Sequence, residues 1–474
     1  MINTTRLVFP GFWFDKTPQE EALALARAGV GGFCLYGGTK TAVATLTRKL
    51  RAASPLPRLL IAADYEDGLG RWLPDAELLP SNLSLGATDD ESLAFEKGYI
   101  TAREALSIGV DWVFAPVVDL ANNAANPIVN TRSFGGDAQK VSRLAGAFMK
   151  GLAQGGALNC LKHFPGHGNT STDSHMAMPV ITDTLAQLQN ETLVPFLTLL
   201  PLADSVMAGH LLVPELDGKN PASLSKIVIH GLLQQAMGFT GCVCTDALLM
   251  KALGDEKQAA LQALDAGAHI LLVPQKPLEL IEFLKLQVFP DEVLKRAEHV
   301  LNSLCTQADK LAATARKTPF SAAEFTQRTA RKALVPLGHF PPVEPGDTVH
   351  LLNVGNDENF SAVPFIDTLR AYGIITEEFK DPAQTDTLII LFWRRYKPFS
   401  GKIGLTEEET TFVNNAVKNV RRTLLICFAN PFAAADVKTE GKLLAFSPSA
   451  VFQQAAAECV MGMFEPVGKL PMNL

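Results

Sequence analysis

The sequence predicts an α/β protein in which a (β/α)8 TIM-like barrel is followed by a smaller three-layer α/β sandwich domain. Short apolar segments alternate with helix-like segments over residues 1–310, and this alternation is typical of a parallel sheet. Several of the apolar segments end in a polar residue, as barrel strands do at their functional face. At 474 residues the chain is longer than one hydrophobic core usually supports, so we expect two domains.

Eight segments are predicted to be barrel strands because each is a short apolar run between helix-like segments. The first lies near Leu7, and the others cover residues 32–36, 59–64, 112–119, 158–163, 206–210, 243–246 and 270–273. The length and apolar spacing of the intervening segments predict amphipathic helices over residues 18–28, 90–108, 138–154, 185–200 and 225–237. Polar residues clustered at the strand ends favour a barrel over an open sheet.

The region after the barrel is expected to comprise a helical linker region, residues 311–345, and a C-terminal domain, residues 346–474. A helical stretch is predicted over residues 291–313, and residues 340–347 are rich in Pro and Gly, as a linker is. Strands are predicted at residues 348–354, 387–393, 423–429 and 442–446, and helices at residues 365–372, 407–419 and 450–461. Their alternation indicates the three-layer α/β unit.

The composition narrows the class of protein. Hydrophobic residues make up 47% of the chain and charged residues 19%, which is ordinary for a globular protein, and the net charge of -7 argues against a nucleic-acid partner. No segment offers about 18 uninterrupted apolar residues and no basic, then apolar, leader is visible, so we expect no membrane partner and no export. Seven cysteines, mostly in apolar runs, suit reduced thiols and a cytoplasmic location. The oligomeric state is not predicted.

Residues 162–175 form the most informative segment of the chain. Lys162 and His163 would emerge at the carboxyl end of a predicted strand, and two glycines allow the following backbone to turn sharply. Asp173 and His175 lie two residues apart, so in an extended segment they point the same way and the carboxylate can orient and charge the imidazole. The segment is therefore expected to be an active-site loop.

Two other interpretations of this loop are open. Its histidines and Asp173 could bind a metal ion, since imidazole is the commonest metal ligand. Against this, Pro165 and the two glycines exclude the helix that carries the compact histidine pattern of zinc enzymes. The loop could also be purely structural, since polar loops are common on surfaces. We favour an active-site loop without a metal ion.

The chain resembles glycoside hydrolase family 3 in the loop just described and in residues 221–225, 238–250 and 266–274. The Asp-Ser-His ending of the loop is similar to the β-N-acetylglucosaminidase branch, which includes cytoplasmic enzymes of peptidoglycan recycling. Residues 468–471 resemble the second domain, so the resemblance covers nearly the whole chain. It implies a retaining, exo-acting β-N-acetylglucosaminidase that cleaves terminal N-acetylglucosamine from muropeptide or chitin-type oligosaccharides. It implies no cofactor.

The resemblance carries catalytic roles to three residues. Asp246 matches the nucleophile, which attacks the anomeric carbon and forms a covalent glycosyl-enzyme intermediate; a helix cap is the alternative. His175 matches the general acid/base, and Asp173 would tune and orient it. An imidazole suits this task because its ordinary pKa of about 6.5 lies near working pH. Asp119 and His210 end other strands and are expected to fix neighbouring rotamers.

The resemblance also implies a sugar-binding pocket. Asp64 matches the aspartate that accepts hydrogen bonds from sugar hydroxyls, Lys162 and His163 are similar to the donors of the pocket, and Arg132 fits its arginine. A solvated surface charge is the alternative for Arg132. The family commonly has Asp-x-Glu-Gly-Gly-Arg-Val, whereas this chain reads Asp-Tyr-Glu-Asp-Gly-Leu-Gly-Arg-Trp from Asp64 onward. The arginine of that motif, Arg71, is displaced and is not assigned to the sugar.

Several alternatives concern the acceptor, the sugar and the second domain. Phosphate could replace water as the acceptor, the sugar could be that of a β-glucosidase or β-xylosidase, or the protein could bind sugars without catalysis. In two-domain β-glucosidases of the family the second domain supplies a glutamate as acid/base, whereas here the barrel loop would supply that function. Residues 393–397 of the second domain are a charge run of the kind that usually forms only a solvated face. The alternative is that they reach a substrate anion, with Trp393 or Tyr396 stacking on a sugar.

Overall fold

The structure of the protein is a computed structural model that describes residues 4–172, 178–250, 253–355, 357, 360–394 and 404–474. The chain divides into two compact units. Unit 1 comprises Met1–Leu79, Glu91–Leu120 and Asp137–Ser321, and unit 2 comprises Pro80–Asp90, Ala121–Gly136 and Ala322–Leu474. Two short segments from the first third of the chain thus belong with its C-terminal part. The domains expected from the sequence are continuous ranges without such inserted segments. Their boundaries stay a prediction.

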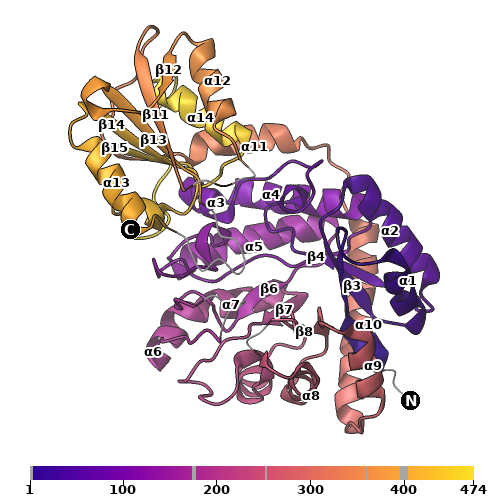
Figure 1. Ribbon diagram of the computed structural model, residues 1–474. Helices are drawn as coiled ribbons and strands as arrows, with labels where there is room; N and C mark the ends of the chain where they lie inside the picture. Colours follow the sequence, from indigo (N-terminus) through magenta and orange to yellow (C-terminus); the bar gives the residue numbers. More distant parts are fainter. Residues whose placement is uncertain (1–3, 173–177, 251–252, 356, 358–359, 395–403) are drawn as a thin grey trace. The chain divides into compact units, whose positions relative to one another are not determined.

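Short parallel strands run through unit 1 (Figure 1). Their bounds are β1 (Val8–Phe9), β2 (Gly11–Trp13), β3 (Gly32–Tyr36), β4 (Leu60–Ala63), β5 (Trp112–Val113), β6 (Leu161–Phe164), β7 (Ser205–Ala208), β8 (Cys242–Thr245) and β9 (Leu271–Leu272). They form sheets of order β2-β3-β4-β5, β6-β7-β8 and β1-β9. Isolated parallel bridges join Trp112 to Leu158 and Cys244 to Ile270. A strand lies within, or directly beside, every segment predicted as a barrel strand.

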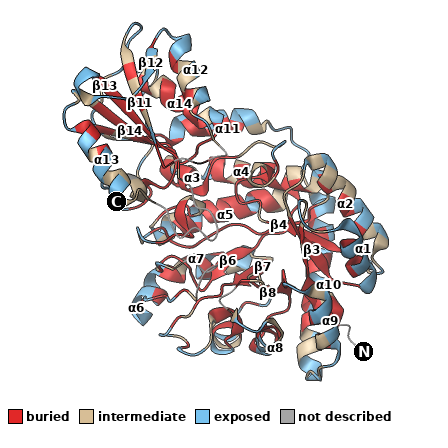
Figure 2. Cartoon of the chain, in the orientation of Figure 1, coloured by how far each residue is buried: buried red, intermediate tan, exposed pale blue. Residues whose placement is uncertain are grey.

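Helices alternate with these strands along the chain, and most of the longer helices have one buried and one exposed side (Figure 2). Their bounds are α1 (Gln19–Ala28), α2 (Lys40–Ala53), α4 (Glu91–Ser107), α5 (Ala138–Gly155), α6 (Leu185–Gln187), α7 (Val194–Leu199), α8 (Glu256–Ala266), α9 (Pro277–Lys285) and α10 (Asp291–Thr314). The side chains of Thr39, Asp137 and Asp255 cap the first turns of α2, α5 and α8. The sequence prediction lacked α2, α8 and α9, and the helix expected over residues 225–237 is a π-helix, η7 (Ile227–Ala236).

The inner faces of the unit 1 strands meet in one apolar cluster. Phe9 packs edge-on against Trp112, with 6.0 Å between ring centroids, and both are fully buried. Cys34, Cys242 and Cys244 belong to the same cluster, where burial raises the pKa of each thiol. Such thiols are packing residues rather than nucleophiles. All seven cysteines of the chain are free thiols.

Unit 2 is built on one mixed sheet of order β10-β15-β14-β13-β11-β12. The strands are β10 (Val335–Gly338), β11 (Thr348–Val354), β12 (Ile375–Glu378), β13 (Thr387–Phe392), β14 (Arg422–Cys427) and β15 (Gly441–Leu444), and only the β10–β15 pair is antiparallel within the described residues. The accompanying helices are α3 (Asn82–Thr88), α11 (Ala322–Ala333), α12 (Val363–Ala371), α13 (Glu407–Val417) and α14 (Ala450–Val460). The sequence prediction lacked the two edge strands, β10 and β12.

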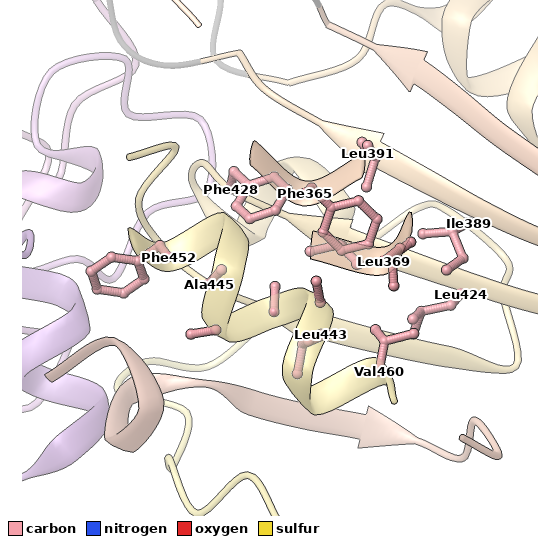
Figure 3. Packing of buried hydrophobic residues seen from close by; sticks show 14 of the residues in the cluster. Phe365, Leu369, Ile389, Leu391, Leu424, Phe428, Leu443, Ala445, Phe452 and Val460 are labelled. Atoms are coloured by element: carbon pink, nitrogen blue, oxygen red, sulfur yellow. The ribbon is translucent and has the colours of Figure 1, made fainter. Parts of the chain in front are cut away.

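Each face of this sheet has its own apolar core. Along β13, Ile389 and Leu391 face a cluster that also contains Phe452 of α14, as Figure 3 shows. The alternate residues Leu388 and Ile390 belong to a second cluster with α13. This alternation follows from the two-residue period of a strand. Unit 2 is therefore a sheet covered by helices on both faces, as the sequence predicts for three layers.

No helix in the described part of the chain has the length and apolar character needed to cross a membrane.

Candidate active site

Four predicted site residues of unit 1 lie within its parallel strands or directly after them. Asp64 directly follows β4 and Asp246 directly follows β8, while Lys162 and His163 lie within β6. The carboxyl ends of parallel strands meet at one edge of the fold, which is where barrel proteins place their reactive groups. The sequence pattern of an apolar run followed by a polar residue thus predicted the strands in which, or directly after which, these four side chains lie.

Lys162 is clamped between two carboxylates. Its Nζ atom lies 2.6 Å from Oδ1 of Asp64 and 2.7 Å from Oε1 of Glu66. Lys162 and Glu66 are each only 1% exposed, whereas the side chain of Asp64 is 24% exposed. Buried charges are tolerated when they are paired, so this arrangement fixes the ammonium and leaves Asp64 as the accessible end of the group.

The ion-pair network extends from Glu66 to three further charged residues. Arg71 lies 3.7 Å from Glu66 and 3.4 Å from Asp67, and Asp67 lies 2.9 Å from the Nζ atom of Lys97 on α4. Burial lowers the pKa of Lys97, and the facing Asp67 partly offsets this effect. The result is a chain of alternating charges, called the charge chain below, which runs Lys97, Asp67, Arg71, Glu66, Lys162 and Asp64. The displaced Arg71 is therefore part of an ion-pair network in unit 1.

Asp119 organises the two histidines of the loop. Its side chain is fully buried and lies 2.7 Å from Nδ1 of His163, and it also accepts the backbone N–H groups of His163 and His167. Burial alone would raise the pKa of Asp119, but the facing histidines outweigh this and lower it. A carboxylate opposite Nδ1 places the proton of His163 on that atom. Asp119 thus fixes the ring, as expected from the sequence.

His167 is a buried imidazole that the sequence analysis did not assign to a role. Its ring lies edge-on to that of His163, with 5.8 Å between centroids. Burial, and then the proximity of His163, lower the pKa of His167 to about 4, although Asp119 and Asp246 act in the opposite direction. The imidazole is therefore neutral at pH 7. Its position within the glycine-containing loop was the signal that could have marked it.

The segment after β8 is held by hydrogen bonds around Asp246. Oδ1 of Asp246 accepts the backbone N–H of Ala247 at 2.7 Å. Nε2 of His210 lies 3.1 Å from the Ala247 carbonyl, and Nδ1 lies 2.7 Å from the Ser223 hydroxyl. Residues 247–250 form a turn and not a helix, so Asp246 does not cap a helix there. His210 thus holds this backbone, and its expected role of fixing neighbouring rotamers stays a prediction.

The family model described as Glycosyl hydrolase family 3 N terminal domain matches residues 3–304 of the chain, which is more than half of its length.

The chain belongs to glycoside hydrolase family 3.

Sequence similarity to named glycosidases supports this family membership. A beta-hexosaminidase of Idiomarina loihiensis is 33% identical over 270 residues, covering 55% of this chain and 80% of that protein. A beta-hexosaminidase of Chromobacterium violaceum is 37% identical over 280 residues, covering 56% and 77%. This family 3 member is therefore a glycosidase.

Solved structures share the fold over the full length of the chain. A family 3 beta-N-acetylglucosaminidase from Paenibacillus has a TM-score of 0.86 at 24% identity and covers 100% of this chain and 99% of that one. A beta-glucoside phosphorylase has a TM-score of 0.89 at 22% identity and covers 100% and 93%. At these identities the likeness concerns the fold only.

The structure does not test the predicted roles of three other residues of the family 3 site. Arg132 lies in unit 2, where it ends a short helix, η3 (Asn130–Arg132), and its carbonyl accepts the Asn82 side chain at 2.7 Å. The other described site residues lie in unit 1, so the pocket role of Arg132 stays a prediction. Asp173 and His175 lie outside the described residues, and their roles as orienting carboxylate and acid/base also stay predictions.

The prediction that Trp393 stacks on a sugar is wrong. Trp393 is only 3% exposed; its ring is stacked on Phe428 with 4.7 Å between centroids, and its Nε1 donates to Oδ1 of Asn353. Arg394 is engaged by Glu409 at 2.7 Å. Trp393, which directly follows β13, packs into the apolar core of unit 2. A local sequence pattern does not reveal this packing. Residues 395–397, including Tyr396, lie outside the described residues.

Within the described part of the chain, no group of three or more His, Cys, Asp or Glu side chains is arranged to hold a metal ion.

Proposed function

We propose that the protein is an exo-acting β-N-acetylhexosaminidase that releases terminal N-acetylglucosamine with retention of configuration. The observation that carries this proposal is the Asp64–Lys162 pair at the same strand edge as Asp246. The names of the relatives at 33% and 37% identity support the choice of an amino sugar. Oligosaccharides of the muropeptide or chitin type and a cytoplasmic location stay predictions.

Asp246 is assigned as the nucleophile of a two-step reaction. Its carboxylate attacks the anomeric carbon while the bond to the leaving oxygen breaks, and His175 gives that oxygen its proton. His175 then removes a proton from water, which attacks the same carbon and releases Asp246. The Ala247 N–H bond to Oδ1 orients the carboxylate. Asp173 is assigned to hold the imidazole.

Asp64, Lys162 and His163 are assigned to the sugar hydroxyls. Asp64 presents a carboxylate acceptor that is partly accessible, and Lys162 is fixed against it by the ion pair. Because Asp119 faces Nδ1 of His163, the Nε2 atom is the one assigned to the substrate. A fixed set of polar groups at one end of a ring determines which hydroxyl pattern is accepted.

We also propose that the unit 1 strands close into a single eight-stranded (β/α)8 barrel. The pairing of β1 with β9 and the bridges Trp112–Leu158 and Cys244–Ile270 support this closure, because they link the three sheets in a ring. Pro10, which lacks an N–H group, separates β1 from β2 within what would be one barrel strand.

Hydrolysis of 4-nitrophenyl β-N-acetylglucosaminide by the purified protein tests the function, with the corresponding β-glucoside as the matched control. We expect release of nitrophenol from the first compound and β-N-acetylglucosamine as the first product anomer by proton NMR. Preference for the glucoside would contradict the amino-sugar assignment, and the α anomer would contradict retention. Formation of a sugar 1-phosphate in added phosphate would instead identify a phosphorylase.

A further inference from the structure

Three aromatic side chains stand beside Asp64. Trp13 and Tyr36 are the last residues of β2 and β3, and they are paired in the register of these parallel strands. Cys34 of β3 is paired with Ala62 of β4, so Tyr36 and Asp64 each lie two residues further along neighbouring strands. Because side-chain direction repeats every two residues, Tyr36 faces the same side as Cys34 in the barrel core.

These aromatic residues contact one another in a continuous group. Trp13 and Tyr36 are stacked, with 4.9 Å between ring centroids and 12° between ring planes. Trp72 meets Tyr36 edge-on at 5.2 Å, and its Nε1 donates to the backbone carbonyl of Asp64 at 3.1 Å. Trp13, Tyr36 and Trp72 are called the aromatic wall below. The hydrogen bond from Trp72 ties this wall to the residue assigned to the sugar.

The aromatic wall lies at the partly exposed margin of the unit 1 core. Phe9 and Trp112, deeper in the same cluster, are fully buried, whereas the three wall residues are only half-buried. Trp13 and Tyr36 pack on this cluster at its partly exposed margin, and so does Ala247, the neighbour of Asp246. The wall and the assigned nucleophile therefore border the same core.

The electrostatic surroundings of Tyr36 agree with this placement. Burial raises the pKa of its hydroxyl, and the carboxylates of Asp64 and Asp246 raise it further. Both assigned carboxylates thus act on this one phenol, which keeps its proton and remains a hydrogen-bond donor at neutral pH.

A pyranose needs two kinds of contact. Its hydroxyls require fixed donors and acceptors, whereas its C–H face is apolar and packs well against aromatic rings. Half-exposed, mutually supported rings supply that surface with little loss of side-chain freedom, because each ring has only two rotatable side-chain bonds.

We propose that the aromatic wall is the stacking surface of the sugar site, and that it packs against the C–H face of the hexopyranose whose hydroxyls Asp64 and Lys162 bind. This inference rests on the proposed function, since it uses the same sugar-binding residues. Tyr36 is the central contact, with Trp13 supporting its face and Trp72 its edge.

Binding of N-acetylglucosamine, measured by calorimetry, tests the stacking surface without turnover. We expect Tyr36→Leu to weaken binding about tenfold and Tyr36→Phe, which keeps the ring, to stay within about twofold. Phe320→Leu is the matched control, because Phe320 is a partly exposed aromatic residue of unit 1 that packs on Tyr99. Unchanged affinity in Tyr36→Leu would overturn the proposal.

Tryptophan emission gives a second test that needs only conservative variants. The chain has four tryptophans, and Trp13 and Trp72 belong to the wall. Binding of N-acetylglucosamine should change the emission of the native protein. In the Trp13→Phe/Trp72→Phe variant this change should disappear while calorimetry still detects binding. A full emission change in that variant would contradict the proposal, even if Tyr36→Leu failed to fold.

The two proposals fail in different ways. If the native protein binds glucose but not N-acetylglucosamine, the amino-sugar function fails, and the same variants titrated with glucose still decide whether the wall stacks on a sugar. If N-acetylglucosamine binds equally to the native protein and to Tyr36→Leu, the stacking surface fails and the proposed function stands.

Discussion

The two units contain parallel strands whose carboxyl ends have very different chemistry. In unit 1 this edge buries Glu66, Lys162 and His163, all of them paired. In unit 2, β13 is followed by the buried Trp393, and Asp357 is the one buried Asp, Glu, Lys, Arg or His side chain among the described residues of this unit. Burying charge is unfavourable unless each charge is compensated. The paired charges of unit 1 are therefore consistent with the chemical task proposed for them, whereas the unit 2 sheet is predominantly apolar.

The largest effect is expected at Asp246. Asp246→Asn removes the carboxylate that we propose as the nucleophile and should lower kcat on 4-nitrophenyl β-N-acetylglucosaminide by about 10⁴-fold or more. The amide oxygen can still accept the Ala247 N–H, so the melting temperature should stay close to that of the native protein. Asp265→Asn, a change at an exposed residue of α8, is the control and should leave kcat unchanged. Turnover at the native rate in Asp246→Asn would contradict the proposed catalytic role of the unit 1 edge.

The next effect contrasts one cation from each unit. Lys162→Met leaves Asp64 and Glu66 close together without their cation, so we expect a loss of about 3–5 kcal/mol of unfolding free energy and a large fall in kcat/KM. Arg394→Met breaks the partly exposed pair with Glu409 in unit 2 and should cost only about 0–1 kcal/mol without loss of activity. Urea unfolding and initial rates measure both. Equal losses in the two variants would contradict the distinction between the units.

A smaller effect tests whether the charge chain acts as a unit. Lys97→Met leaves the carboxylate of Asp67 without its buried partner and should destabilise the protein by about 3 kcal/mol in urea unfolding. The double variant Lys97→Met/Asp67→Leu removes both charges and should recover much of that loss. Lys150→Met, at an exposed position of α5, should change stability by less than about 0.5 kcal/mol. Additive losses in the double variant would show that the pair is not coupled.

The last effect is a pH dependence of stability and concerns a buried histidine of unit 1. Burial and Arg296 lower the pKa of His269 to about 3, and its Nδ1 accepts the Val243 N–H at 3.0 Å. The folded protein then binds fewer protons than the unfolded chain between pH 3 and about 6.5, so stability is complete above that range and falls as the pH decreases. The slope is up to about 1.4 kcal/mol per pH unit.

His269→Asn keeps an acceptor for Val243 and removes this titration. The unfolding free energy should therefore depend less steeply on pH between pH 6.5 and 4, and the decrease in slope should correspond to about one proton fewer taken up on unfolding. His339→Asn, at an exposed residue of unit 2, is the control and should preserve the native slope. An unchanged slope in His269→Asn would show that His269 does not contribute.

The sequence predicted this edge of unit 1 because its signal is local. An apolar run followed by a polar residue placed Asp64, Lys162 and Asp246 at strand ends, and the structure confirms those strands. Lys97 was missed although a signal exists, since it lies on the same face of α4 as the buried residues Leu93, Ala94 and Thr101. A lysine on an apolar helix stripe indicates a buried ion pair.

Other features depend on contacts that no local pattern contains. Ala121 and Val129 pack into the core of unit 2, and this packing assigns the segment with Arg132 to that unit. Trp393 looked like an exposed stacking residue because its neighbours in the sequence are basic, yet it is buried against Phe428. In both cases the partner lies elsewhere in the chain, so only the folded arrangement reveals it.

The sheet of unit 2 ends in strands that resist further strand addition. The antiparallel edge strand β10 contains Pro336, which cannot donate a backbone hydrogen bond to an incoming chain. The opposite edge strand, β12, ends in Glu377 and Glu378, which place like charges where another strand would dock. Both edges thus disfavour the edge-to-edge strand pairing that leads to fibres and aggregates.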